Sequence, residues 1–157
     1  MALFRRNISM ILLHSFFAFI ATFAFSILFN IKGRNTFFAA VGGGLGWFVY
    51  TFSLKLDFST ILSFFNASIV VAIYSETMAR ILKTPVTTIL ICAIIPLVPG
   101  SGMYYTMLET IKGDVNKALS EGLITITIAG VIAIGIILVS SIVKLINYYK
   151  AYKKGLK

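Results

Sequence analysis

The chain has 157 residues, of which 59% are hydrophobic and only 12% are charged, and its mean hydropathy is +0.96. Charged residues make up about a quarter of a soluble domain, so this composition excludes an ordinary soluble protein and predicts an all-α integral membrane protein. The net charge of +9 does not indicate nucleic-acid binding, because the basic residues lie between and after apolar runs, as they do beside membrane helices.

Few residues in the chain are suited to catalysis or to binding a metal. The single cysteine, Cys92, excludes a disulfide framework and a thiolate metal site, and the single histidine, His14, cannot form a metal site alone. The sequence contains no phosphate-binding loop and no nucleophile–base motif. We therefore expect no enzyme activity, no cofactor and no metal.

The first three predicted helices are long enough to cross a bilayer, which takes about 20 apolar residues per helix. They cover residues 8–31, 36–54 and 58–80. The second contains small residues four positions apart, a spacing that lets another helix backbone approach closely.

The fourth apolar segment, 85–98, is short for a full crossing and ends in the run Pro96-Leu97-Val98-Pro99-Gly100-Ser101-Gly102. Because proline removes a helical hydrogen bond and glycine favours a break, this segment either crosses as a broken helix or re-enters the membrane. An amphipathic segment, 102–120, and a last helix, 123–146, follow. The prediction is a single membrane domain over 1–157 with about five transmembrane helices.

The lysines and arginines indicate an orientation. With five crossings, the 32–34 loop, the 76–83 loop and the tail from Lys144 hold nine of them on one side, and the other side holds five. Positively charged loops favour the cytoplasm, so the pattern favours an outside N-terminus and a cytoplasmic tail. With four crossings, both termini would lie on the same side.

The break in the fourth segment is the predicted substrate site. Freed backbone groups inside a membrane survive only where protein or a polar cavity satisfies them, and transporters bind substrates at broken helices. A half-helix that begins near Gly100 would direct free N–H groups at a carboxylate. The candidate substrate-binding residues are Pro99, Gly100, Ser101, Gly102, Tyr104, Tyr105 and, on the third helix, Asn66.

Three of the polar residues have two open interpretations. Asn66 could bind substrate, or it could join two helices by a hydrogen bond that contributes about 0.6 kcal/mol. Glu109 and Asp114 are candidates for proton coupling if they fold back into the bundle, where desolvation would raise their pKa. On an exposed amphipathic helix they would be ordinary solvated acids.

The run from Pro96 to Leu108, preceded by Ile91-Cys92-Ala93-Ile94-Ile95, resembles the signature of the threonine/serine exporter family. More specifically, it resembles the small, separately encoded membrane subunit of the YjjB-like branch. The Gly113-Asp114 step, the segment Ala118–Gly122 and the glycine-rich last helix are also similar to that family.

The resemblance implies a subunit of a secondary exporter of threonine and serine, or of dicarboxylates such as succinate, that is driven by protons. It also implies a larger membrane subunit as partner, so that this chain would be half of an inverted-repeat transporter in the cell (inner or plasma) membrane. Two alternatives stay open: a non-transporting structural or assembly subunit, and a channel-like homo-oligomer.

Overall fold

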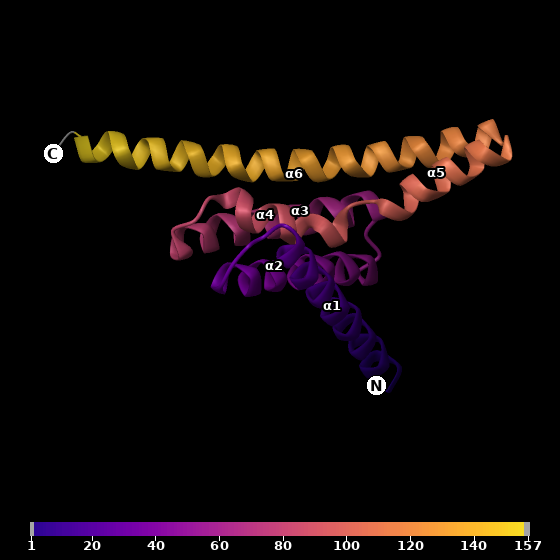
Figure 1. The fold of residues 1–157 in the computed structure, drawn as a ribbon, viewed down its shortest axis with the longest axis horizontal. Helices are drawn as coiled ribbons and strands as arrows, with labels where there is room; N and C mark the ends of the chain where they lie inside the picture. Colours follow the sequence, from indigo (N-terminus) through magenta and orange to yellow (C-terminus); the bar gives the residue numbers. More distant parts are fainter. Residues whose placement is uncertain (1, 156–157) are drawn as a thin grey trace.

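The computed structural model describes the backbone of residues 2–155 and the side chains of residues 9–150, 152 and 153. The described chain is all helical (Figure 1). Its elements are α1 (Ala2–Leu28), α2 (Arg34–Lys55), α3 (Thr60–Leu82), α4 (Val86–Ile94), the 3-10 turn η1 (Ile95–Leu97), α5 (Gly100–Lys112) and α6 (Val115–Gly155).

The centre of the molecule is a close packing of α2, α3 and α4. Gly42 of α2 lies against Ala93 of α4, and one turn later Gly46 lies against Leu97, so these two helices run in the same direction. At both glycines an added Cβ would come within about 3.4 Å of these neighbours. The glycines of α2 therefore bring α4 to the distance that close helix pairs in membranes need.

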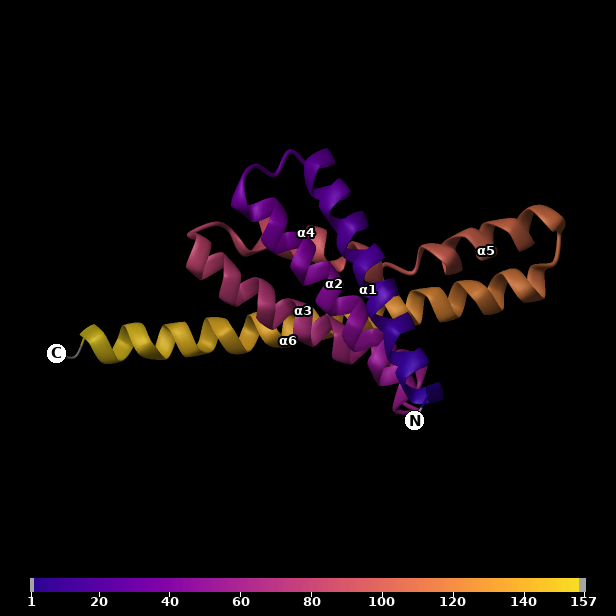
Figure 2. The same cartoon turned by 90° about the horizontal axis from the view of Figure 1, so that it is seen from below.

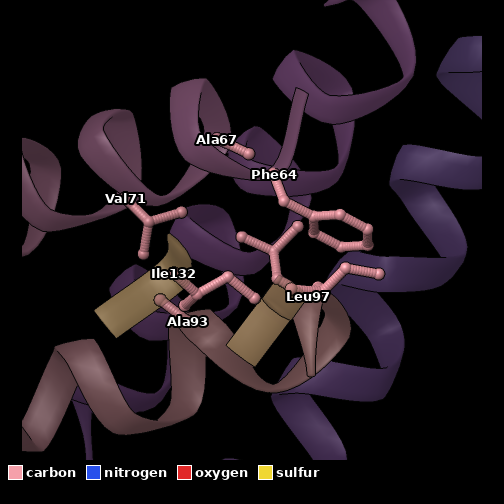
Figure 3. Packing of buried hydrophobic residues seen from close by; sticks show 7 residues of the cluster. Phe64, Ala67, Val71, Ala93, Leu97 and Ile132 are labelled. Carbon is pink, nitrogen blue, oxygen red and sulfur yellow. The ribbon is translucent and has the colours of Figure 1, made fainter. Parts of the chain in front are cut away.

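Two apolar clusters show that α3 runs opposite to α4. Near the break, Val71 of α3 packs with Leu97, whereas at the other end Ala79 of α3 packs with Ile89 at the start of α4. The larger cluster gathers side chains from α3, α4, η1 and α6 (Figure 3). Its buried members are Phe64, Ala67, Val71, Ala93, Leu97, Ile128 and Ile132.

The outer helices α1 and α6 pack through glycine contacts of the same kind. Thr22 of α1 lies on Gly43 of α2, and Ser68 of α3 lies on Gly135 of α6. Along this contact α6 runs parallel to α3. With 41 residues, α6 is about 60 Å long, twice the thickness of a bilayer's hydrocarbon core. Its first third pairs with α5 in a hairpin that extends beyond the rest of the bundle (Figures 1 and 2).

Within the part of the chain that the structure describes, four helices are long and apolar enough to cross a membrane, and a fifth span exists if α4–η1 and α5 count as one. This bent pair turns by 53° at the break. The result confirms the all-α membrane fold with four to five spans and a broken fourth element.

The charges of the described side chains separate toward the two ends of the bundle. The end formed by the C-termini of α1, α3 and α6 and the N-termini of α2 and α4 carries the cations Lys32, Arg34, Arg80, Lys83, Lys150 and Lys153, with Glu76 nearby. Toward the opposite end lie the acids Asp57, Glu109, Asp114 and Glu121, with Lys55, Lys112 and Lys117. We call the first of these the basic end.

The structure differs from the expected helix bounds most clearly in the first helix and in the region after the break. The predicted last helix, 123–146, starts earlier, at Val115, and the predicted amphipathic segment, 102–120, is divided between two helices by a turn. Gly113 ends α5 because it adopts a left-handed conformation, with φ 81°. The predicted first helix, 8–31, ends at Leu28, where the left-handed Asn30 stops it.

Candidate functional site

The break between α4 and α5 leaves polar backbone groups at the edge of an apolar core. Pro96 has no N–H group, and α4 tightens into η1 before the extended Val98. Pro99 is the N-cap of α5 and gives it no side-chain cap. The first α-helical bond is donated by the Met103 N–H to the Pro99 carbonyl, at 3.2 Å. Among the described residues, none caps the N–H groups of the two preceding residues.

The two glycines at the start of α5 have different surroundings. A Cβ added at Gly102 would collide with the Thr125 side chain of α6, so this glycine allows the hairpin helices to approach closely. A Cβ added at Gly100 would meet no atom within 4 Å. Gly100 therefore faces open space beside the uncapped turn.

The break is anchored on both sides. Before it, Leu97 is fully buried in the cluster of Figure 3. After it, Gly102 is held against Thr125. The uncapped turn at Ser101 thus lies between two fixed points, which keeps its N–H groups in place before a ligand arrives.

The predicted site residues that follow the uncapped turn have their side chains on the open side of α5. Tyr104 and Tyr105 are 62% and 51% exposed, their rings lie edge to face with centroids 5.4 Å apart, and Ser101 is exposed as well. In this chain they form one wall, with no described residue closing the opposite side.

Asn66 lies away from the break. It shares one face of α3 with the exposed Ile73 and Thr77, at positions i+7 and i+11, whereas Leu97 packs on the Val71 side of that helix. The structure therefore does not bring Asn66 together with Gly100–Tyr105, and its role in substrate binding stays a prediction.

Glu109 and Asp114 are held by local contacts around the turn of the hairpin. Lys112 Nζ donates to Glu109 Oε1 at 2.8 Å, and the Glu109 side chain is 15% exposed. The Lys117 N–H donates to Asp114 Oδ1 at 3.1 Å, which caps the start of α6, and Lys117 Nζ lies 3.6 Å from Oδ2. These contacts account for both acids structurally, and their coupling role stays a prediction.

Sequence reasoning misses the threonines that hold the hairpin together. Thr125 lies on Gly102, and Thr106 lies on Gly122 from the opposite helix. Both hydroxyls donate to carbonyls one turn earlier. The Thr106 methyl group is the atom nearest to Gly122, whereas the Thr125 hydroxyl is the atom nearest to Gly102. The available signal is the four-residue spacing of Gly102 and Thr106, which repeats the small-residue spacing of α2.

The described geometry is a broken membrane helix whose second half presents an uncapped N-terminus. A family model described as "Threonine/Serine exporter, ThrE" matches residues 14–142. The chain belongs to the threonine/serine exporter family. No curated protein and no solved structure matched the chain in the same comparisons.

Membership of this exporter family confirms the resemblance carried by the Pro–Gly break. The matched region covers the second half of α1, all of α2 to α5 and most of α6, so it includes the break and the hairpin. The chain is thus a multi-pass membrane transporter protein and not an enzyme, consistent with a place in the cell membrane.

Proposed function

We propose that this member of the exporter family is a subunit of a proton-coupled secondary exporter and binds the carboxylate of its substrate at the α4–α5 break. The substrates would be threonine and serine, or dicarboxylates such as succinate. The observation that supports the proposal is the uncapped first turn of α5, which opens onto free space at Gly100.

A carboxylate fits this turn for electrostatic reasons. The N–H groups of Ser101 and Gly102 precede the first helical bond of α5, and the positive end of the helix dipole adds to their field. The Ser101 hydroxyl and the tyrosines that follow could orient the rest of the ligand. Bonds to a charged acceptor stabilise by about 1.5–3 kcal/mol each, enough to select a carboxylate.

The exposed side of α5 is available for contact with a second polypeptide. Tyr104, Met107 and Ile111 are 62%, 66% and 80% exposed on a helix that extends beyond the bundle. In a membrane such a face contacts either lipid or another helix, and this one continues the open wall that begins at the substrate turn. A larger membrane subunit of opposite orientation would supply the missing wall, so that the substrate would bind between two inverted halves.

Glu109 is the better placed of the two candidate proton carriers. It follows the break by little more than two turns, and its side chain is mostly buried between the helices of the hairpin. Protonation would release Lys112 from its 2.8 Å bond, which would change the charge of α5 about 16 Å along the helix from the substrate turn. Asp114 lies at the far end of the hairpin, where it caps α6.

The first test fills the open space at the break. Gly100→Leu should reduce uptake of labelled threonine, serine or succinate at least tenfold in proteoliposomes that contain the chain and a candidate partner subunit. Gly130→Leu is the matched control, because a Cβ at Gly130 also meets no atom within 4 Å and this glycine lies on the face of α6 opposite Ile128 and Ile132, which pack with Leu97 beside the break. The control should transport like the wild type.

The outcome separates transport from the alternatives. Equal transport by Gly100→Leu and the wild type would contradict a substrate site at the break. Binding of the labelled substrates to the purified partner alone, with no change when this chain is added, would instead support a structural or assembly subunit. Transport by this chain alone as a homo-oligomer would support the channel-like interpretation.

A further inference from the structure

A groove of about 330 Å³ runs between α3 and α6 toward the basic end of the bundle, far from the broken helix. Its inner part is apolar and is formed by Ile73 of α3 and by Val143 and Ile146 of α6. Ile73 and Ile146 are 52% and 46% exposed, so the groove is open to whatever surrounds the bundle. Its volume lies at the lower end of the range for sites that hold small ligands.

The outer part of the same groove is cationic. Arg80 follows Ile73 by seven residues, and Lys150 follows Val143 by seven, so both cations lie two helical turns, about 10 Å, beyond the apolar wall. The two cations lie at the same level along the groove because α3 and α6 run parallel. The groove therefore presents an apolar channel with two positive charges at one end.

The acid in this groove neutralises only part of that charge. Glu76 faces Arg80 one turn earlier, with 3.9 Å between Oε2 and Nη2, which is long for an ion pair, and the Arg80 side chain is 49% exposed. A guanidinium has five N–H donors, so Arg80 can bind a second anion. Lys150 has no ion pair among the described residues, and Lys83 and Lys153 add positive charge at the same end.

The position of the groove favours a lipid over a soluble anion. Tyr148, Tyr149 and Tyr152 are all exposed beside Lys150, and tyrosines with lysines are typical of the headgroup region. The excess of cations makes this end the cytoplasmic one, and the cytoplasmic leaflet is the one rich in anionic lipids. A free phosphate would use the cations but would leave the apolar wall uncovered.

We propose that this groove binds one anionic phospholipid, with the phosphate between Arg80 and Lys150 and an acyl chain along Ile73 and Ile146. The site is independent of the substrate site at the α4–α5 break. Its occupant would hold the ends of α3 and α6 together from the lipid side.

The test is native mass spectrometry of the full chain released from detergent micelles that contain phosphatidylglycerol and phosphatidylcholine. The wild type should retain one phosphatidylglycerol in preference. Each cation near an anionic headgroup is worth about fivefold in affinity, so Arg80→Gln with Lys150→Gln should lower that affinity about 25-fold. Lys112→Gln with Lys117→Gln removes the same charge at the opposite end and should leave the affinity unchanged.

Two further variants probe the details of the site. Glu76→Gln removes the acid and should raise the affinity for phosphatidylglycerol several-fold. Ile146→Trp fills the apolar channel and leaves the charges intact, so it should lower the affinity for phosphatidylglycerol. Inorganic phosphate, as a competitor, should not displace the lipid.

Three results would each overturn the proposal: equal lipid retention by the Arg80/Lys150 variant and the wild type, an equal loss in the Lys112/Lys117 control, or displacement of the lipid by phosphate. Because Lys150→Gln changes only an exposed side chain near the end of α6, this single variant tests the site even if changes at Arg80 impair folding. It should lower the affinity about fivefold.

Discussion

Gly100 and Gly102 stand two positions apart at the start of α5, and the structure assigns them different roles. Gly102 is a packing residue, because the Thr125 side chain occupies the space where its Cβ would be. Gly100 has free space around it, so packing does not explain its presence. The proposed carboxylate site makes use of that space.

Gly102→Ala should therefore destabilise the protein, whereas Gly100→Ala should not. An extra methyl group in a close contact costs about 1–3 kcal/mol, which should lower the thermal unfolding midpoint in detergent. Thr125→Ala removes the hydroxyl that collides with the new Cβ, so it should restore part of the loss in the double variant. An unfolding midpoint for Gly102→Ala equal to that of the wild type would show that the hairpin is looser than described.

The residues at the break were predictable from the sequence because proline and glycine act locally. The partner of Gly102 was not, because Thr125 is 23 positions away and its contact depends on the fold of the hairpin. The position of Asn66 relative to the break was also not predictable from the sequence. Its polarity singles it out within an apolar helix, but only the packing of α3 against η1 shows that it faces away from the break.

At the scale of elements, the turn between α5 and α6 shows how a short polar signal positions long helices. Gly113 terminates α5 in a left-handed conformation, and Asp114 begins α6 by accepting the Lys117 N–H. The sequence indicated a helix end at this step. It did not indicate that α6 starts there, because Lys117 and Glu121 resemble the residues of a loop outside the membrane more than those of a membrane helix.

Asp114→Asn and Asp114→Ala should separate the capping role of this residue from a coupling role. Asparagine caps helices as well as aspartate does, whereas alanine loses about 1 kcal/mol. Asp114→Ala should thus lower the thermal unfolding midpoint and Asp114→Asn should not. If Asp114→Asn nevertheless abolished the pH dependence of transport in proteoliposomes, Asp114 and not Glu109 would be the proton carrier.

At the scale of the whole molecule, the helix directions and the separated charges predict an orientation. If α4 and α5 count as one span, that span runs against the direction of α3 and α6, and the bundle has five spans of alternating direction. The excess of cations then predicts that the basic end faces the cytoplasm and that the hairpin turn lies on the opposite side.

Cysteine labelling tests this arrangement. In a Cys92→Ala background, a membrane-impermeant maleimide should label Lys117→Cys in intact cells, and it should label Lys153→Cys only after the membrane is opened. Both lysines are exposed, so access and not burial decides the result. Labelling of both positions from the same side would mean that α6 does not cross the membrane. Labelling of Lys83→Cys from the same side as Lys117→Cys would mean that the bent pair re-enters the membrane and that only four helices cross it.

The unbroken course of α6 has a mechanical consequence. The helix packs on the core from Ile128 to Gly135, and its arm from Ile128 toward Val115 is 13 residues or about 20 Å long. A rotation of this arm by about 10° would carry the hairpin end through roughly 3 Å. The break between α4 and α5 would allow α5 to move with this end of α6 while α4 stays in the core.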